Sequence, residues 1–242
     1  PTTGVYSVKH HFDQATTGAG PYGTLLLSSN GKIYGTTLQG GSNSYGTMFE
    51  YNITTSSLTK KYDFDSTASY PIGQMIETSP GIIFGISYQG GAVNYGTVYQ
   101  YTISTNTLIV KDEFDAIKGG FCVSGLMRAN NGILYGLALG GVNTKGTLFQ
   151  FSLTEDSIRK LHDFDGLDAK NPSYLLTQGA NGKLYGGSKQ GGVAGTSNGF
   201  GTLFDYDINL DSVTILKQLR YSLSDTGYYP QSAMIETSPG KF

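Results

Sequence analysis

Four aspartates follow a phenylalanine at regular intervals along the chain, and they are the first candidates for acid–base or metal chemistry. They are Asp13, Asp65, Asp115 and Asp165. A ring of carboxylates could bind a cation, and glycosidic hydrolysis needs two carboxylates roughly 5–10 Å apart. Catalytic groups rarely recur in every unit of a repeat, whereas Asp commonly accepts backbone N–H bonds in its own turn. We therefore interpret all four as structural turn residues.

Histidine and cysteine offer little else for catalysis. The three histidines, His10, His11 and His162, lack HExxH spacing, so we interpret them as solvated residues of an outer strand. The single cysteine, Cys122, lies in an apolar stretch and is expected to be a small buried hydrophobe. The Gly-Gly pairs do not match GxxxxGK(S/T) and are expected to form turns. We thus expect no catalytic residue, no metal site and no cofactor.

Aromatic and amide side chains recur beside loops and are the candidates for ligand binding. Some precede a Gly-Thr pair, and others adjoin a proline where a loop enters a strand. Flat aromatic rings with amide donors suit the C–H faces and hydroxyls of sugars, whereas the alternative is that they pack loop against loop. The candidates are Tyr22, Tyr70, Tyr229, Tyr45, Tyr95, Asn43 and Asn94.

Two Asp-Ser-aliphatic triplets occupy the same turn of successive repeats, and a looser third precedes them. Their serines are Ser157, Ser212 and Ser66. The triplet resembles a short O-glycosylation signal of exported bacterial proteins, although Asp-Ser is also ordinary turn chemistry.

The elements that position these residues recur every 50 residues or so. The sequence G-x-(I/L)-(Y/F)-G begins at Gly31, Gly81, Gly132 and Gly182, at steps of 50, 51 and 50 residues. A fixed period of this length indicates a solenoid, a propeller or an array. Each copy reads as four strands, with an Asn-Gly or Gly-Gly turn between early strands and a charged outer strand. Four antiparallel strands per unit are typical of a β-propeller blade.

We therefore predict a single all-β domain over 1–242, a β-propeller with four complete blades and a fifth that is split or partial. Either the two ends share one incomplete blade, or the sequence is a fragment of a longer repeat chain, which the stop within a strand favours. The predicted blades span 21–64, 73–114, 124–164 and 173–219, with 231–242 and 5–12 in the fifth.

The full repeat pattern resembles the bacterial GloVer (Gloeo-Verruco) tandem repeat. This pattern is G-x-(I/L)-(Y/F)-G, followed by G-G, then G-T-(L/M/V)-(F/Y)-x-(Y/F), and finally F-D. The resemblance covers almost the whole chain, and the period is Kelch-like. It implies a propeller in a large exported protein, extracellular or at the cell surface. It implies no general biochemical activity.

Composition excludes some partners. The formal net charge is −2 and charged residues make up 14% of the 242 residues, so no basic footprint for nucleic acid exists. No apolar run approaches the roughly 20 residues of a membrane helix, so we expect no membrane insertion.

Three functions fit these observations. The first is a non-enzymatic binding or scaffold module that engages a glycan or another protein, such as secretion or cell-surface machinery, through one loop face. The second is a propeller enzyme, a polysaccharide lyase or hydrolase. The longer loop at 193–198 marks the fourth blade as the specialised one for such an enzyme. The site of this enzyme would use Asp168, Lys170, Arg220, Tyr228 and Tyr229. The third function is a structural repeat array of an adhesin or secretion assembly.

Overall fold

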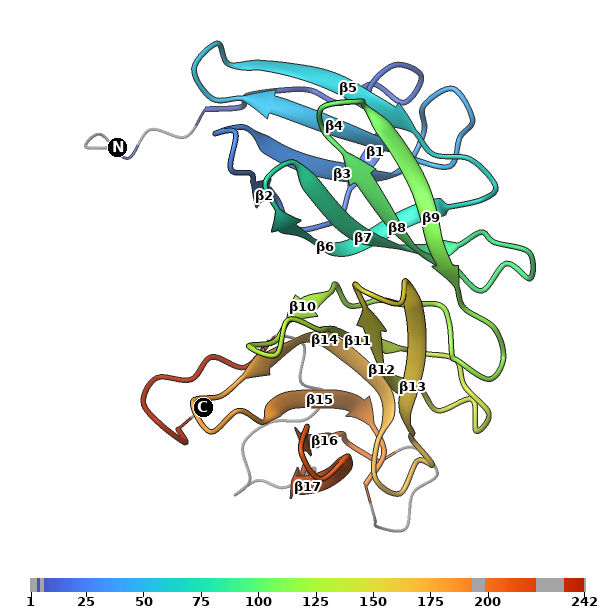
Figure 1. Ribbon diagram of the computed structural model, residues 1–242, viewed down its shortest axis with the longest axis vertical. Coiled ribbons are helices and arrows are strands. Elements are labelled where there is room, and N and C mark those ends of the chain that lie inside the picture. The colour runs from blue at the N-terminus through green and yellow to red at the C-terminus, as the bar shows by residue number, and fades with distance from the viewer. Residues whose placement is uncertain (1–3, 5–6, 193–198, 221–232, 242) are drawn as a thin grey trace.

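The computed structural model describes residues 4, 7–192, 199–220 and 233–241, and within these ranges every regular element is a β-strand. The strands form four antiparallel sheets, one for each sequence repeat. Figure 1 shows the sheets following one another along the molecule, from the first at the top to the fourth at the bottom. The predicted all-β blades with consecutive strands are confirmed.

Strands pair in chain order in the second, third and fourth sheets, and in the first sheet β1 and β2 both pair with β3. The first sheet contains β1 (Ala19–Pro21), β2 (Leu26–Leu27), β3 (Ile33–Gln39), β4 (Thr47–Asn52) and β5 (Ser57–Asp63). The second contains β6 (Ser69–Ser79), β7 (Ile82–Gln89), β8 (Thr97–Thr102) and β9 (Thr107–Glu113). The third contains β10 (Met127–Arg128), β11 (Leu134–Ala138), β12 (Thr147–Ser152) and β13 (Ser157–Asp163). The fourth contains β14 (Lys170–Gln178), β15 (Leu184–Gln190), β16 (Thr202–Asp207) and β17 (Ser212–Gln218).

The first strand of each repeat is irregular at its middle, where neighbouring repeats meet. A Cβ on Gly73 would lie 2.4 Å from the carbonyl oxygen of Ser124, and one on Gly125 would lie 2.2 Å from the nitrogen of Gln74. Leu126 N donates a hydrogen bond of 3.2 Å to Gln74 O across this contact. Glycine is therefore required here because the backbones of successive inner strands touch.

The core lies between successive sheets and is built from the same positions each time. The phenylalanine of each Phe-Asp pair packs its ring against an aromatic ring of the next sheet, and all of these rings are buried. The pairs are Phe64–Tyr99, Phe114–Phe149 and Phe164–Phe204, with ring centroids 5.3, 5.0 and 5.2 Å apart. A second aromatic contact joins the same sheets at Tyr34–Tyr101, Phe84–Phe151 and Tyr135–Tyr206. The repeat thus specifies one interface three times.

Buried hydroxyl pairs join the second and third strands of three repeats. They are Thr37–Thr47, Ser87–Thr97 and Ser188–Thr202, with oxygens 2.8–2.9 Å apart. In the third sheet Ala138 takes the first position of the pair, opposite Thr147. Thr147 Oγ1 is consequently the one buried side-chain polar atom without a hydrogen bond among the described residues.

The third repeat is also one residue short. Gly136 and Gly140 are four positions apart, whereas the corresponding glycines of the other repeats are five apart. The missing residue corresponds to Gln39, Gln89 and Gln190, each of which pairs with the first strand of its sheet. β11 therefore ends early, and its connection to β12 takes a different path.

Candidate functional site

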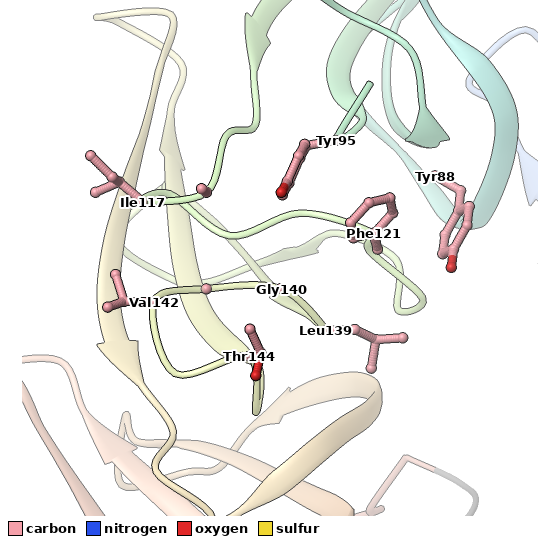
Figure 2. Close-up of a pocket in the computed structure, with 10 residues that line it drawn as sticks. Tyr88, Tyr95, Ile117, Phe121, Leu139, Gly140, Val142 and Thr144 are labelled. Carbon is pink, nitrogen blue, oxygen red and sulfur yellow. The ribbon is translucent and has the colours of Figure 1, made fainter. Parts of the chain in front are cut away.

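A pocket of about 620 Å³ lies between the second and third sheets, at the end of the blades where β7–β8, β9–β10 and β11–β12 are connected. Figure 2 shows its lining from all three connections. One of the predicted ligand-binding residues, Tyr95, belongs to its lining. The lining residues are Tyr88, Tyr95, Ala116, Ile117, Phe121, Leu139, Gly140, Gly141, Val142 and Thr144.

Phe121 is the centre of the aromatic wall. Its ring centroid lies 4.9 Å from that of Tyr95 and 5.5 Å from that of Tyr88. Phe121 has φ of 54°, a conformation rare for a bulky residue, and its N–H donates to Tyr95 O at 2.9 Å. The same backbone bond recurs from Tyr70 to Tyr45, so the repeat fold itself holds the ring in place.

Aliphatic side chains form the facing wall. Ile117 and Val142 are 68% and 64% exposed, and Figure 2 shows them across the pocket from Phe121 and Tyr88. No charged side chain belongs to the described lining; its polar groups are the hydroxyls of Tyr88, Tyr95 and Thr144 and backbone at Gly140. An apolar hollow with a few polar groups is typical of a binding site for an apolar side chain or small ligand.

The pocket borders the connection in which the third repeat is one residue short. In the second sheet Gln89 pairs with Ser69, and in the third sheet Gly140 takes this place, because its N–H donates to Gly120 O at 2.9 Å. Leu139 follows the last residue of β11 and lines the pocket. Sequence analysis missed Tyr88, Phe121 and the aliphatic wall. The available signal was the spacing of Gly136 and Gly140.

The predicted ligand-binding residues fall in different places. Tyr95 lines the pocket, and Asn94 Oδ1 beside it accepts from Gly90 N at 2.9 Å. Tyr45 and Tyr70 form an edge-to-face pair at the junction of the first and second sheets, with centroids 5.8 Å apart. Asn43 Nδ2 donates to Phe64 O at 3.0 Å. Both asparagines thus fix loops, and the two tyrosines of the first junction pack on each other.

Tyr22 lies apart from this group. It is exposed and lines a second cavity of about 440 Å³ among the inner strands, together with Gln74, Val123 and Leu175. Tyr22 and Tyr70 occupy different positions of their repeats, because Gly20 has the positive φ that Tyr70 has in the next repeat. Tyr229 lies outside the described residues.

The repeated aspartates are occupied by their own turns. Asp13, Asp65, Asp115 and Asp165 accept through Oδ1 from a backbone N–H two or three residues later, at 2.7–2.9 Å. Hydrogen bonds from the side chain and backbone of Thr16 lower the pKa of Asp13 below its usual value. No group of three potential metal-ligating side chains occurs in the part of the chain that the structure describes.

His162 forms the one His–carboxylate pair among the described residues. Its Nε2 lies 2.6 Å from Asp168 Oδ2. Burial raises the pKa of Asp168, but the hydrogen bonds from His162 and from the N–H groups of Asp165 and Ala169 outweigh it, so the pKa lies below its usual value. The ring of His162 also packs edge-on against Phe164 at 5.0 Å. This pair fastens the third blade to the loop that follows it.

Cys122 is fully buried, as expected of a small hydrophobe, and burial raises the pKa of its thiol. The three candidate glycosylation serines lie in or beside turns. Ser66 and Ser212 are exposed, whereas Ser157 is half-buried. Their modification stays a prediction.

The family model described as the Gloeobacter/Verrucomicrobia repeat matches residues 1–197. The chain belongs to this family. No curated protein matches the chain. Among the described residues, no helix has the length and hydropathy needed to cross a membrane.

Solved structures with the same architecture share little sequence. The extracellular domain of a putative one-component system from B. thetaiotaomicron has a TM-score of 0.58 at 13% identity, over 87% of this chain and 24% of that one. A chain of the nidogen/laminin complex has a TM-score of 0.57 at 12% identity, over 89% of this chain and 68% of that one. Putative TolB from Agrobacterium tumefaciens has a TM-score of 0.51 at 10% identity, over 86% of this chain and 67% of that one. The chain spans 41% of TolB from Acinetobacter baumannii. These likenesses show the β-propeller fold alone.

Proposed function

We propose that this chain is a non-enzymatic binding module that holds another protein through the loop end of its second and third blades. The pocket between these blades is the observation that carries the proposal. It is open at the surface, and Ile117 and Val142 at its rim are exposed although both are aliphatic. Exposed apolar side chains around an aromatic hollow are typical of protein interfaces, where a few buried anchors supply most of the binding energy.

The lining favours a protein partner over a glycan. Sugar recognition depends on hydrogen bonds to hydroxyl groups, and this pocket offers only three hydroxyls with backbone at Gly140. Its walls are otherwise carbon, from Phe121, Leu139, Ile117 and Val142. A large apolar side chain of a partner would bury these surfaces, at roughly 25 cal/mol per Å² of apolar area removed from water.

The polysaccharide lyase or hydrolase has no comparable support. Asp168, its central residue, already bonds His162 and two backbone N–H groups. Tyr228 and Tyr229 lie outside the described residues. The neighbours include an extracellular domain, which supports placing this module in an exported or cell-surface bacterial protein.

Peptide-display selection against the folded chain, run beside a glycan array, tests the proposal. We expect selected peptides to share a large apolar residue, and Ile117→Asp to weaken their binding at least about tenfold in calorimetry. Leu210→Asp is the matched control, because Leu210 is 74% exposed and lies in the β16–β17 turn at the other end of the blades. Selective glycan binding with no peptide selected would contradict a protein-binding role.

A further inference from the structure

One face of the first sheet has no other sheet packed against it among the described residues. Leu25 is 57% exposed there, and Leu27 and Ile53 are exposed as well. The same face carries Ile33 and Tyr51, which are half-buried. Apolar side chains that stay exposed or half-buried along three neighbouring strands of one sheet mark an interaction surface rather than ordinary scatter.

The other three sheets show what this face is built to do. The counterparts of Leu25 are Met75, Leu126 and Leu176, which are only 2%, 0% and 2% exposed. The counterparts of Ile33 are fully buried in all three sheets: Ile83, Leu134 and Leu184. The residue types are conserved across the repeats while the burial differs. The face of the first sheet is therefore an inter-repeat interface that lacks its partner.

The existing interfaces define the chemistry of that partner. Met75, Ile83 and Tyr101 of the second sheet are covered by Tyr34 and Met48 of the first. Leu176, Leu184 and Tyr206 of the fourth sheet are covered in the same way by Tyr135 and Leu148 of the third. The partner must thus present an aromatic residue from a second strand and an apolar residue from a third strand, side by side.

One part of this partner is already in place. Phe12 packs edge-to-face on Phe49 with centroids 5.1 Å apart, the contact that Phe64 makes with Tyr99 between complete sheets. Residues 7–12 therefore occupy the place of a fourth strand against the first sheet. An apolar hollow of about 480 Å³ remains beside them, lined by Val8, Leu25, Ile33 and Tyr51 among others. The fourth-strand position is filled, and the positions of the second and third strands are open.

The fourth sheet argues against a second copy of the chain as the partner. In such an assembly its outer face would have to cover the first sheet of another copy. That face is already engaged, because Thr177 Oγ1 donates to Met234 O at 2.5 Å and Ala180 N donates to Glu236 Oε2 at 2.8 Å. Glu236 takes the role of Glu77, which accepts from Ser29 N across the first interface at 2.7 Å.

We infer that the face formed by Leu25, Ile33, Tyr51 and Ile53 is the docking surface for a further repeat of this same family. The second and third strands of that repeat fill the hollow beside residues 7–12. This surface is separate from the pocket of the proposed function, and the inference does not depend on that function.

A labelled peptide with the sequence of residues 31–53, which carries Tyr34 and Met48, is the probe. Fluorescence anisotropy should show saturable binding to the chain, weakened at least about tenfold by Leu25→Asp and unchanged by Leu210→Asp. A peptide with Tyr34→Asp and Met48→Asp should fail to bind. Binding that Leu25→Asp leaves unchanged would overturn the inference.

A second measurement removes the dependence on a free hairpin. The same segment, joined to the N-terminus through a flexible linker, should raise the melting temperature by several degrees, and the double Asp version should not. Equal melting temperatures, together with no binding of the free peptide, would overturn the inference. A dimer in light scattering that Leu25→Asp abolishes would overturn it too, by showing that a second copy is the occupant.

Discussion

The junction of the first and second blades and the junction of the second and third use the same parts with different results. At the first junction Tyr45 and Tyr70 pack on each other and Gln89 extends the sheet. At the second, Tyr95 and Phe121 also pack on each other, with their ring planes tilted by 37°, and the connection after β11 is one residue short. The two joints thus differ by one residue in the connection after the second strand, and the second joint carries the pocket.

The largest expected effect concerns the covered faces. Phe151 is fully buried between the second and third sheets, so Phe151→Ala should cost about 3–5 kcal/mol of unfolding free energy. Its counterpart Tyr51 is only half-buried, and Tyr51→Ala should cost less than half as much. Chemical denaturation of both variants measures the difference. Equal losses would show that the face of the first sheet is as well packed as the others.

The next prediction restores the repeat. Inserting Gln between Leu139 and Gly140 gives the third repeat the spacing of the other three. The added residue should extend β11, fill the pocket and weaken binding of a selected peptide at least about tenfold. Circular dichroism should show the fold retained. If a folded insertion variant bound the peptide as tightly as the parent, the missing residue would not be the cause of the pocket.

A smaller effect concerns the orphaned hydroxyl. Ala138→Ser supplies the partner that Thr147 Oγ1 lacks, as Ser87 does for Thr97. A buried hydrogen bond of this kind is worth about 0.5–1.5 kcal/mol, so the variant should be more stable by about that amount. Ser87→Ala is the mirror experiment and should be destabilising. A loss of stability in Ala138→Ser would mean that the third sheet has repacked around alanine.

The smallest effect depends on pH. Hydrogen bonds in the fold lower the pKa of Asp168, so its contribution to stability is complete above the pKa of the unfolded chain, about 4, and is lost as the pH falls through the lower folded value. Asp168→Asn should therefore be less stable than the parent at neutral pH, with a difference that shrinks below pH 4. Melting curves between pH 7 and 3 measure this. A difference independent of pH would assign the effect to packing.

The repeat period made the fold predictable, because each copy carries the same turn glycines, alternating strand and Phe-Asp pair. The turn role of Asp65 and the burial of Cys122 also followed from local chemistry. The site was only partly predictable. Tyr95 was a candidate, but Phe121 was not, because its place in the pocket depends on a backbone bond to a loop 26 positions earlier.

The role of the longest loop stays a prediction. The sequence favoured the fourth blade because of the insertion at 193–198, which lies outside the described residues. The pocket lies instead where the third repeat lost a residue. The exposure of Leu25 could not be predicted either, because Leu25 and Met75 are both apolar residues two positions after a glycine and differ in the sheet beside them.

The most direct test of the central claim is a titration of the isotope-labelled chain with a display-selected peptide, followed by nuclear magnetic resonance. The account predicts that the largest shifts cluster on Tyr88, Tyr95, Phe121 and the segment from Leu139 to Thr144. Shifts centred on Tyr22 and Gln74 instead would place binding in the inner cavity and contradict the account.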